Sequence, residues 1–205
     1  IAGALNITEG VGTITSAASI ASVNIEAGNY TVNAQTIDGV VTATGENAFY
    51  VEVINGDVTI NGKGEINDAT INGDVTLNGD MLLNNVIVKG NVTVEDGTVK
   101  MADSNIIGTL EVRASAEVVV AGNNIHVNAI ENYGSLTTFV DIYTKTVAVY
   151  KGATAIVADG KTIWYTKPNA GQFGYIQEGV TNGRILYLQV NVETSTPDAI
   201  KDALG

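Results

Sequence analysis

The chain has 205 residues, enough for one domain or two small ones, and 45% of them are apolar, which is enough for a continuous core. Its net charge of −12 argues against binding nucleic acid or an anionic membrane, because both need a cationic surface. The absence of Cys excludes disulfides and thiolate metal sites, and no apolar run is long enough for insertion into a membrane.

A repeat of 17 or 18 residues occupies the first 112 residues. Each unit starts with a small residue, passes one variable residue, and continues with an aliphatic, polar, aliphatic triplet. Seven units begin at Gly3, Ala21, Gly39, Gly56, Gly73, Gly90 and Gly108. In a strand the first and third residues of a triplet point to one face and the middle residue to the other. The fixed period therefore predicts a solenoid in which each strand pairs in parallel with its equivalent one coil later.

Each unit carries two further apolar clusters, and three short sides predict a triangular coil. The second cluster includes Val32, Phe49, Leu83 and Val99, and the third includes Ile37, Ile54, Ile71, Val88 and Ile106. We expect right-handed coils because strict six-residue periodicity is absent. The leading Gly is expected to turn the corner, often with a positive φ. Asn and Asp cluster near the other bends, where they tolerate left-handed backbone and form ladders.

Beyond residue 125 the repeat loosens, although 147–149 and 155–157 indicate further coils. Nine of the 12 aromatic residues lie between Tyr133 and Tyr187. A strand is predicted over 184–192, and a short helix begins at the N-cap Thr196 and ends at Gly205. The sequence thus predicts an all-β, single-stranded parallel β-helix of about nine coils over 1–160, with a C-terminal capping or assembly segment over 161–205.

The units GDVTINGKGEINDATIN (56–72) and GDVTLNGDMLLNNVIVK (73–89), and the run NNVIVKGNVTV (84–94), resemble two groups of β-helical proteins. One is the bactofilins, which are polymer-forming, and the other is the wall-exposed repeats of Gram-positive proteins with surface-layer-homology domains. The resemblance covers roughly 39–127 and implies a β-helical architecture and a tendency to join end to end. Bactofilins lack an aromatic C-terminal part like this one, and no functional residues carry over from either group.

Acidic residues stack at one corner, where Asp57 and Asp74 occupy the same place in successive coils and Asp38 precedes the corner before them. Such a column suits Ca²⁺, which takes six to eight oxygen ligands, but a solvated acidic corner explains it as well. Large β-helices often cleave polysaccharides with clustered carboxylates, yet coils this short leave no loops to wall a cleft. His126 is the middle of an alternating triplet and should point outward. We therefore expect a non-enzyme that needs no cofactor.

The leading functional hypothesis is a structural protein on or outside a cell, which stacks with copies of itself into a filament or lattice. It would join end to end through Leu5 and Ile7 of the first coil, or by addition of a strand containing Ile185, Tyr187 and Gln189. The alternative is a surface adhesin that binds cell-wall or extracellular polysaccharide through aromatic side chains, with Trp164, Tyr165 and Tyr175 as candidates. The same aromatic residues would equally fill a widened core.

Overall fold

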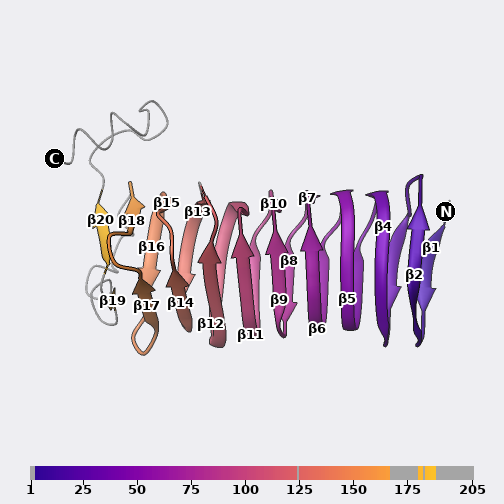
Figure 1. Ribbon diagram of the computed structural model, residues 1–205, viewed down its shortest axis with the longest axis horizontal. Helices are drawn as coiled ribbons and strands as arrows, with labels where there is room; N and C mark the ends of the chain where they lie inside the picture. The colour runs from indigo at the N-terminus through magenta and orange to yellow at the C-terminus, as the bar shows by residue number, and fades with distance from the viewer. Residues whose placement is uncertain (1–2, 124, 167–179, 182, 188–205) are drawn as a thin grey trace.

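The structure is a computed structural model that describes residues 3–123, 125–166, 180–181 and 183–187. Within them the chain is all β, with about nine parallel coils stacked into one sheet system and no helix. Figure 1 shows the strands side by side along the long axis, with β1 and β2 at one end and β19 and β20 at the other. The predicted parallel β-solenoid is confirmed.

Backbone pairing follows three ladders, and several long strands turn a corner and contribute to more than one of them. The first ladder contains β1 (Ala4–Ile7), β3 (Ser22–Ile25), β8 (Val75–Asn78), β16 (Thr146–Val149) and parts of β5 (Val41–Ile54), β6 (Val58–Asn67), β11 (Val92–Ala102), β12 (Asn105–Ala121) and β13 (Ile125–Asn132).

The second ladder contains β2 (Val11–Ser16), β4 (Asn29–Ile37), β9 (Met81–Asn84), β14 (Ser135–Thr138), β17 (Thr154–Val157), β19 (Val180–Thr181) and the later parts of β5, β6, β11 and β12. The third contains β7 (Thr70–Ile71), β10 (Ile87–Val88), β15 (Ile142–Thr144), β18 (Thr162–Tyr165), β20 (Arg184–Tyr187), the ends of β4 and β5, and the starts of β12 and β13.

The triplets of the repeat set the register of the first ladder. Leu5 pairs with Val23, Val23 with Val41, and the same alignment continues through Val58 and Val75. From Val23 onward these side chains are at most 1% exposed, while the middle residues Thr59 and Thr76 reach the surface. The predicted inward column of aliphatic side chains is confirmed. Its burial is the main stabilising term of such a fold.

The leading glycines were expected to have positive φ, and this expectation is wrong for the described structure. Positive φ occurs at glycines of other bends and at Asp68, Asn85 and Asp103, but not at Gly56, Gly73 or their equivalents. The reason for a leading Gly is instead close approach between coils. A Cβ on Gly73 would lie 2.6 Å from the carbonyl carbon of Gly56, a separation that side chains do not tolerate.

Beyond residue 125 the ladders continue, as predicted for 147–149 and 155–157, which form parts of β16 and β17. The ladders extend past residue 160 in β18 and β20, so the boundary between the solenoid over 1–160 and the segment over 161–205 stays a prediction. The right-handed twist and the triangular cross-section of the coils also stay predictions. The strand expected over 184–192 is present as β20 over Arg184–Tyr187. Its remaining residues and the helix over 196–205 lie outside the described part of the chain.

Candidate functional site

The first coil exposes one edge of the solenoid. β1 pairs with β3 and β2 pairs with β4, and no other described strand pairs with either. The backbone N–H of Glu26 donates to the carbonyl of Ile7 at 2.8 Å, so Ile7 faces the second coil. Because successive residues of a parallel strand direct their backbone groups to opposite neighbours, the N–H and C=O of Asn6 face the open edge.

The interior of the first coil is only partly covered. Leu5, Ile7 and Ile14 are half-buried, whereas Val23, Ile25 and Val32, which pair with them one coil later, are 0% exposed. Val11 of the same coil is 80% exposed. The edge therefore combines unpaired backbone with apolar side chains, which is the surface that another parallel coil would bury.

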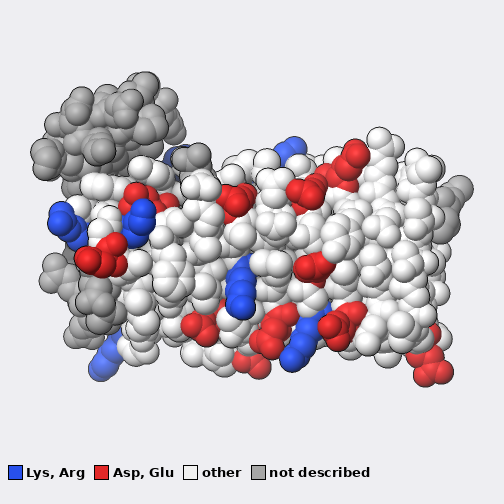
Figure 2. All heavy atoms as spheres, in the orientation of Figure 1, with Lys and Arg blue, Asp and Glu red and all other residues white. Residues whose placement is uncertain are grey.

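Charge is unevenly distributed along the solenoid. Residues 1–62 contain six acidic side chains and no Lys or Arg, and residues 1–25 contain only Glu9. In the described C-terminal coils, basic side chains outnumber acidic ones by four to two. The basic residues are Lys145, Lys151, Lys161 and Arg184, and the acidic ones are Asp141 and Asp159. Figure 2 shows this contrast on one face, where the end that carries the first coils is mostly uncharged and blue side chains gather near the other end.

The predicted C-terminal assembly residues are partly used within the chain. Ile185 pairs with Ile163 and packs against the core, and Tyr187 is the register partner of Tyr165. Gln189 lies outside the described residues. Strand addition through this segment would therefore have to use the edge of β20 that faces away from β18.

The aromatic candidates do not form one surface. Trp164 and Tyr165 are neighbours on β18 and point to opposite faces, and Tyr165 packs against the core. Trp164 instead continues an outward row with Tyr143 and His126 on β15 and β13. The rings of His126 and Tyr143 stack with centroids 5.5 Å apart, and burial raises the pKa of Tyr143. Tyr175 lies outside the described residues.

When two aromatic rings stack on each other, each ring uses one of its faces for the contact. A second pair, Tyr133 and Tyr150, is stacked at 4.0 Å with planes 8° apart, and the hydrogen bond between their side chains, with burial and Glu131, raises the pKa of Tyr133. A ring that covers its neighbour in the next coil has less face to offer a sugar. The described pairs therefore support the ladder more directly than they support a sugar-stacking platform.

The acidic corner forms a hydrogen-bonded column. The carboxylate of Asp57 accepts from the backbone N–H of Asp74 at 2.8 Å, and that of Asp74 accepts from Asn91 at 2.7 Å. Asp38 belongs to the neighbouring column, in line with Asn55. Across the described ranges, no group of three or more His, Asp or Glu side chains has the arrangement of a metal site.

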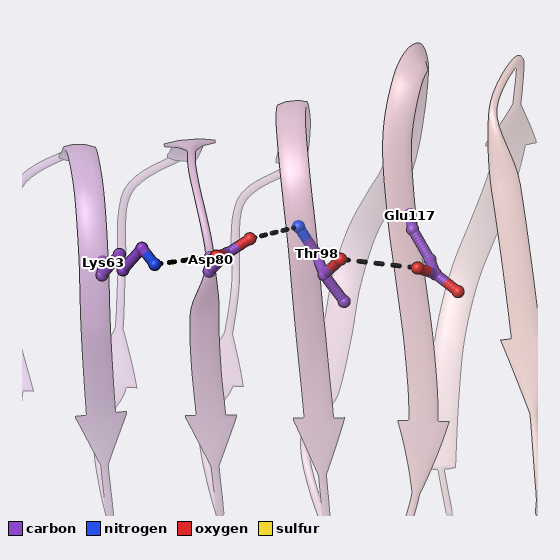
Figure 3. Close-up of polar contacts among 4 residues, drawn as sticks. All are labelled: Lys63, Asp80, Thr98 and Glu117. Carbon is purple, nitrogen blue, oxygen red and sulfur yellow. Dashed lines mark hydrogen bonds and ion pairs between the residues drawn. The ribbon is translucent and has the colours of Figure 1, made fainter.

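A second cross-coil chain of polar contacts was not predicted from the sequence. Lys63 Nζ lies 3.5 Å from Asp80 Oδ2, Asp80 Oδ1 accepts from the backbone N–H of Thr98 at 3.0 Å, and Thr98 Oγ1 donates to Glu117 at 3.4 Å (Figure 3). The hydrogen bond from Thr98 and, less strongly, the Lys63 ammonium lower the pKa of Asp80, against an opposing effect of partial desolvation. The sequence does contain one signal of this chain of contacts, because the four residues follow one another at a spacing of about one coil.

Comparison with known proteins gives little further guidance. No protein-family model matches the chain, and no curated protein matches it. One solved structure, described as a possible adhesin C-terminal domain from Caldicellulosiruptor kronotskyensis, aligns over 98% of this chain with a TM-score of 0.43 and 15% identity. This chain spans 60% of the length of that structure. No described helix has the length and apolar character needed to cross a membrane.

Proposed function

We propose that this protein is a non-catalytic structural element of a cell surface, and that its solenoid joins copies of itself end to end into a filament. The observation that carries the proposal is the edge of β1 and β2, where unpaired backbone groups lie beside the half-buried side chains of Leu5, Ile7 and Ile14. A further parallel coil is the structure that satisfies both, because it pairs with the backbone and buries the apolar groups.

A head-to-tail contact fits this edge better than two like ends. The first coil, whose charged side chain is Glu9, would meet the coils that contain Lys161 and Arg184, and the acids of the next coils lie behind it without any cation up to residue 62, so opposite charges approach each other. A contact between two different surfaces can be repeated from subunit to subunit. When the rotation between subunits does not complete a ring, the repeated contact forms a filament. The resemblance to wall-exposed repeats supports an extracellular location, and the acidic composition is compatible with it.

The test uses proline on the open edge. Asn6→Pro removes an N–H that faces away from the second coil, and edge strands tolerate Pro at such a position. We expect the wild type to form filaments visible by electron microscopy at high concentration, and Asn6→Pro to sediment as a folded monomer. Ile7→Pro is the control, because it removes a donor that faces β3 and should unfold the first coil.

The outcomes separate assembly from folding. Circular dichroism and thermal unfolding show whether each variant keeps the solenoid, and sedimentation reports its size. A wild-type chain that stays monomeric at every concentration tested would overturn the proposal. Filaments that persist in Asn6→Pro with the same length distribution would show that assembly uses another surface.

A further inference from the structure

The outer face of β2, β4, β5 and β6 carries two depressions side by side, far in sequence from the aromatic C-terminal coils. One, of about 660 Å³, includes Thr31, Glu46 and Glu65 in its wall. The other, of about 550 Å³, includes Asn33, Tyr50 and Asn67. Both are open to solvent and both extend over strands of four successive coils.

A hydrogen bond between Tyr50 and Glu65 forms the ridge between the depressions. The hydroxyl of Tyr50, which lines one depression, donates to Glu65 Oε1, which lines the other. This hydrogen bond and the nearby Glu65 charge raise the pKa of Tyr50. Tyr50 is 43% exposed although it stands in the middle of the face, so part of its ring is available to a ligand.

The wall also contains a polar group that the protein leaves unsatisfied. Asn67 is 7% exposed, and its Nδ2 has no hydrogen-bond partner, while its Oδ1 accepts from Asn84 at 3.1 Å. The ladder of amides stops here because the register partner of Asn67 in the preceding coil is Tyr50 and not another Asn. A buried donor without an acceptor is costly, and a ligand oxygen that displaces part of the exposed Tyr50 side chain to reach Nδ2 would remove that cost.

The remaining side chains define the chemistry of a ligand. Hydroxyl and amide groups dominate the rest of the face, from Thr13, Thr15, Thr31, Asn33 and Gln35. Four carboxylates, from Glu46, Glu52, Glu65 and Asp68, are the charged groups, and no Lys or Arg is among the described lining residues. Hydroxyl-rich ligands match such a lining, whereas anionic polymers would be repelled by it.

We propose that this face binds an uncharged oligosaccharide, which crosses the Tyr50–Glu65 ridge and places sugar hydroxyls among the Thr, Asn and Gln side chains of both depressions. The exposed part of the Tyr50 ring contacts an apolar face of one sugar. This binding site lies on the outer side of the coils, and its centre at Tyr50 and Glu65 is two and three coils away from the open edge, although β2 of that edge lines one end of both depressions.

Calorimetric titration tests the site with four uncharged hexasaccharides, built from β-1,4-linked glucose, xylose, mannose or N-acetylglucosamine. We expect at least one to bind, and Tyr50→Ala to weaken that binding about tenfold or more. Tyr50→Phe keeps the ring and should retain most of the affinity. Trp164→Ala removes an aromatic side chain on another ladder and should leave the affinity unchanged.

Thermal unfolding shows whether each variant remains folded, and titration of the assembly-blocked Asn6→Pro chain separates this site from the filament. The proposal is overturned if none of the four hexasaccharides binds, or if binding is unaffected by Tyr50→Ala. Loss of binding in Trp164→Ala would assign recognition to the C-terminal aromatic row. Binding that requires Ca²⁺ and disappears in Glu65→Gln would indicate a cation site instead.

Discussion

The carboxylate of Asp57 accepts a hydrogen bond from the backbone N–H of Asp74, one coil further along the solenoid, at 2.8 Å. Asp74 does the same for Asn91 at 2.7 Å, and Asn91 does the same for Thr109 at 2.9 Å. Each side chain therefore satisfies a backbone donor at the corner of the next coil. An acidic column that resembles a ligand site in the sequence has a structural role in the fold.

Removal of one link of this column should destabilise the solenoid modestly. Asp74→Ala leaves the N–H of Asn91 without its acceptor, and we expect the free energy of unfolding to fall by about 1 kcal/mol. Asp74→Asn keeps an acceptor, as Asn91 does at the equivalent position, and should cost less. Urea denaturation measures both. Stabilisation by Ca²⁺ in the wild type that is lost in Asp74→Asn would contradict a purely structural role.

Acid should weaken the contact between Lys63 and Asp80. The pKa of Asp80 is lowered in the folded protein, so its charged form contributes stability above the unfolded pKa of about 3.9. That contribution is lost as the pH falls through the folded value. We expect the difference in melting temperature between wild type and Asp80→Asn to be small at pH 7, because both side chains are exposed, and to decrease as the pH falls below the unfolded pKa of Asp80.

The comparison needs one control, because other carboxylates also titrate in acid. Lys63→Met removes the cation and leaves the Thr98 hydrogen bond to Asp80 in place. Asp80→Asn can keep an acceptor for Thr98 but loses the negative charge from both contacts, so Lys63→Met, which loses only the ion pair, should show a smaller loss at neutral pH. An equal pH dependence in wild type and Asp80→Asn would show that Asp80 has the same pKa in the folded and unfolded chains.

Two glycines with positive φ should respond differently to alanine. Gly64 has φ +152°, and a Cβ there would overlap the carbonyl oxygen of Asn47 in the preceding coil. Gly160 has φ +71° with nothing within 4 Å of a Cβ. Gly160→Ala should cost about 1 kcal/mol from backbone strain alone, whereas Gly64→Ala should cost about 3 kcal/mol or prevent folding. Chemical denaturation of the two variants under the same conditions tests this order, and equal losses would contradict it.

The sequence was informative wherever the spacing stayed constant. A unit of 17 or 18 residues determines which residues pair, so the alignment of Val41, Val58 and Val75 followed from their triplets. In the later coils the spacing changes: Leu110 pairs with Ile130, and Tyr143 with Trp164. Because a shift of one residue moves a side chain to the opposite face, the row of His126, Tyr143 and Trp164 could not be derived without the structure.

The candidate sites were less predictable for a different reason. Whether an Asp binds a cation or a backbone N–H depends on the path of the next coil, and the sequence does not contain that geometry. The depressions around Tyr50 had no signal either, because Thr, Asn and Glu are ordinary outward residues of a strand. Only the structure shows that Asn67 has a buried donor without an acceptor.

The amount of filament should depend on the NaCl concentration, and the form of that dependence should distinguish a head-to-tail contact from a contact between two like ends. Each chain carries a net charge of −12, so repulsion between chains opposes association at low ionic strength. If two first coils met, no pair of opposite charges would attract across the contact, and screening of the repulsion between chains would strengthen assembly steadily up to high salt. In a head-to-tail contact, screening also weakens the attraction between the region over 1–62 and the coils that contain Lys161 and Arg184. We therefore expect filament mass, measured by light scattering, to pass through a maximum as NaCl is raised.

The variant Arg184→Glu provides the matched test of that contact. It reverses one charge on β20, at a side chain that is exposed, so the fold should be retained. Assembly of this variant should be weaker than that of the wild type at low salt and should approach it at high salt, where the charges are screened. Lys63→Glu makes the same change of net charge on the side of the solenoid, away from both ends. If Arg184→Glu and Lys63→Glu reduce assembly equally, only the total charge matters and the head-to-tail contact is wrong.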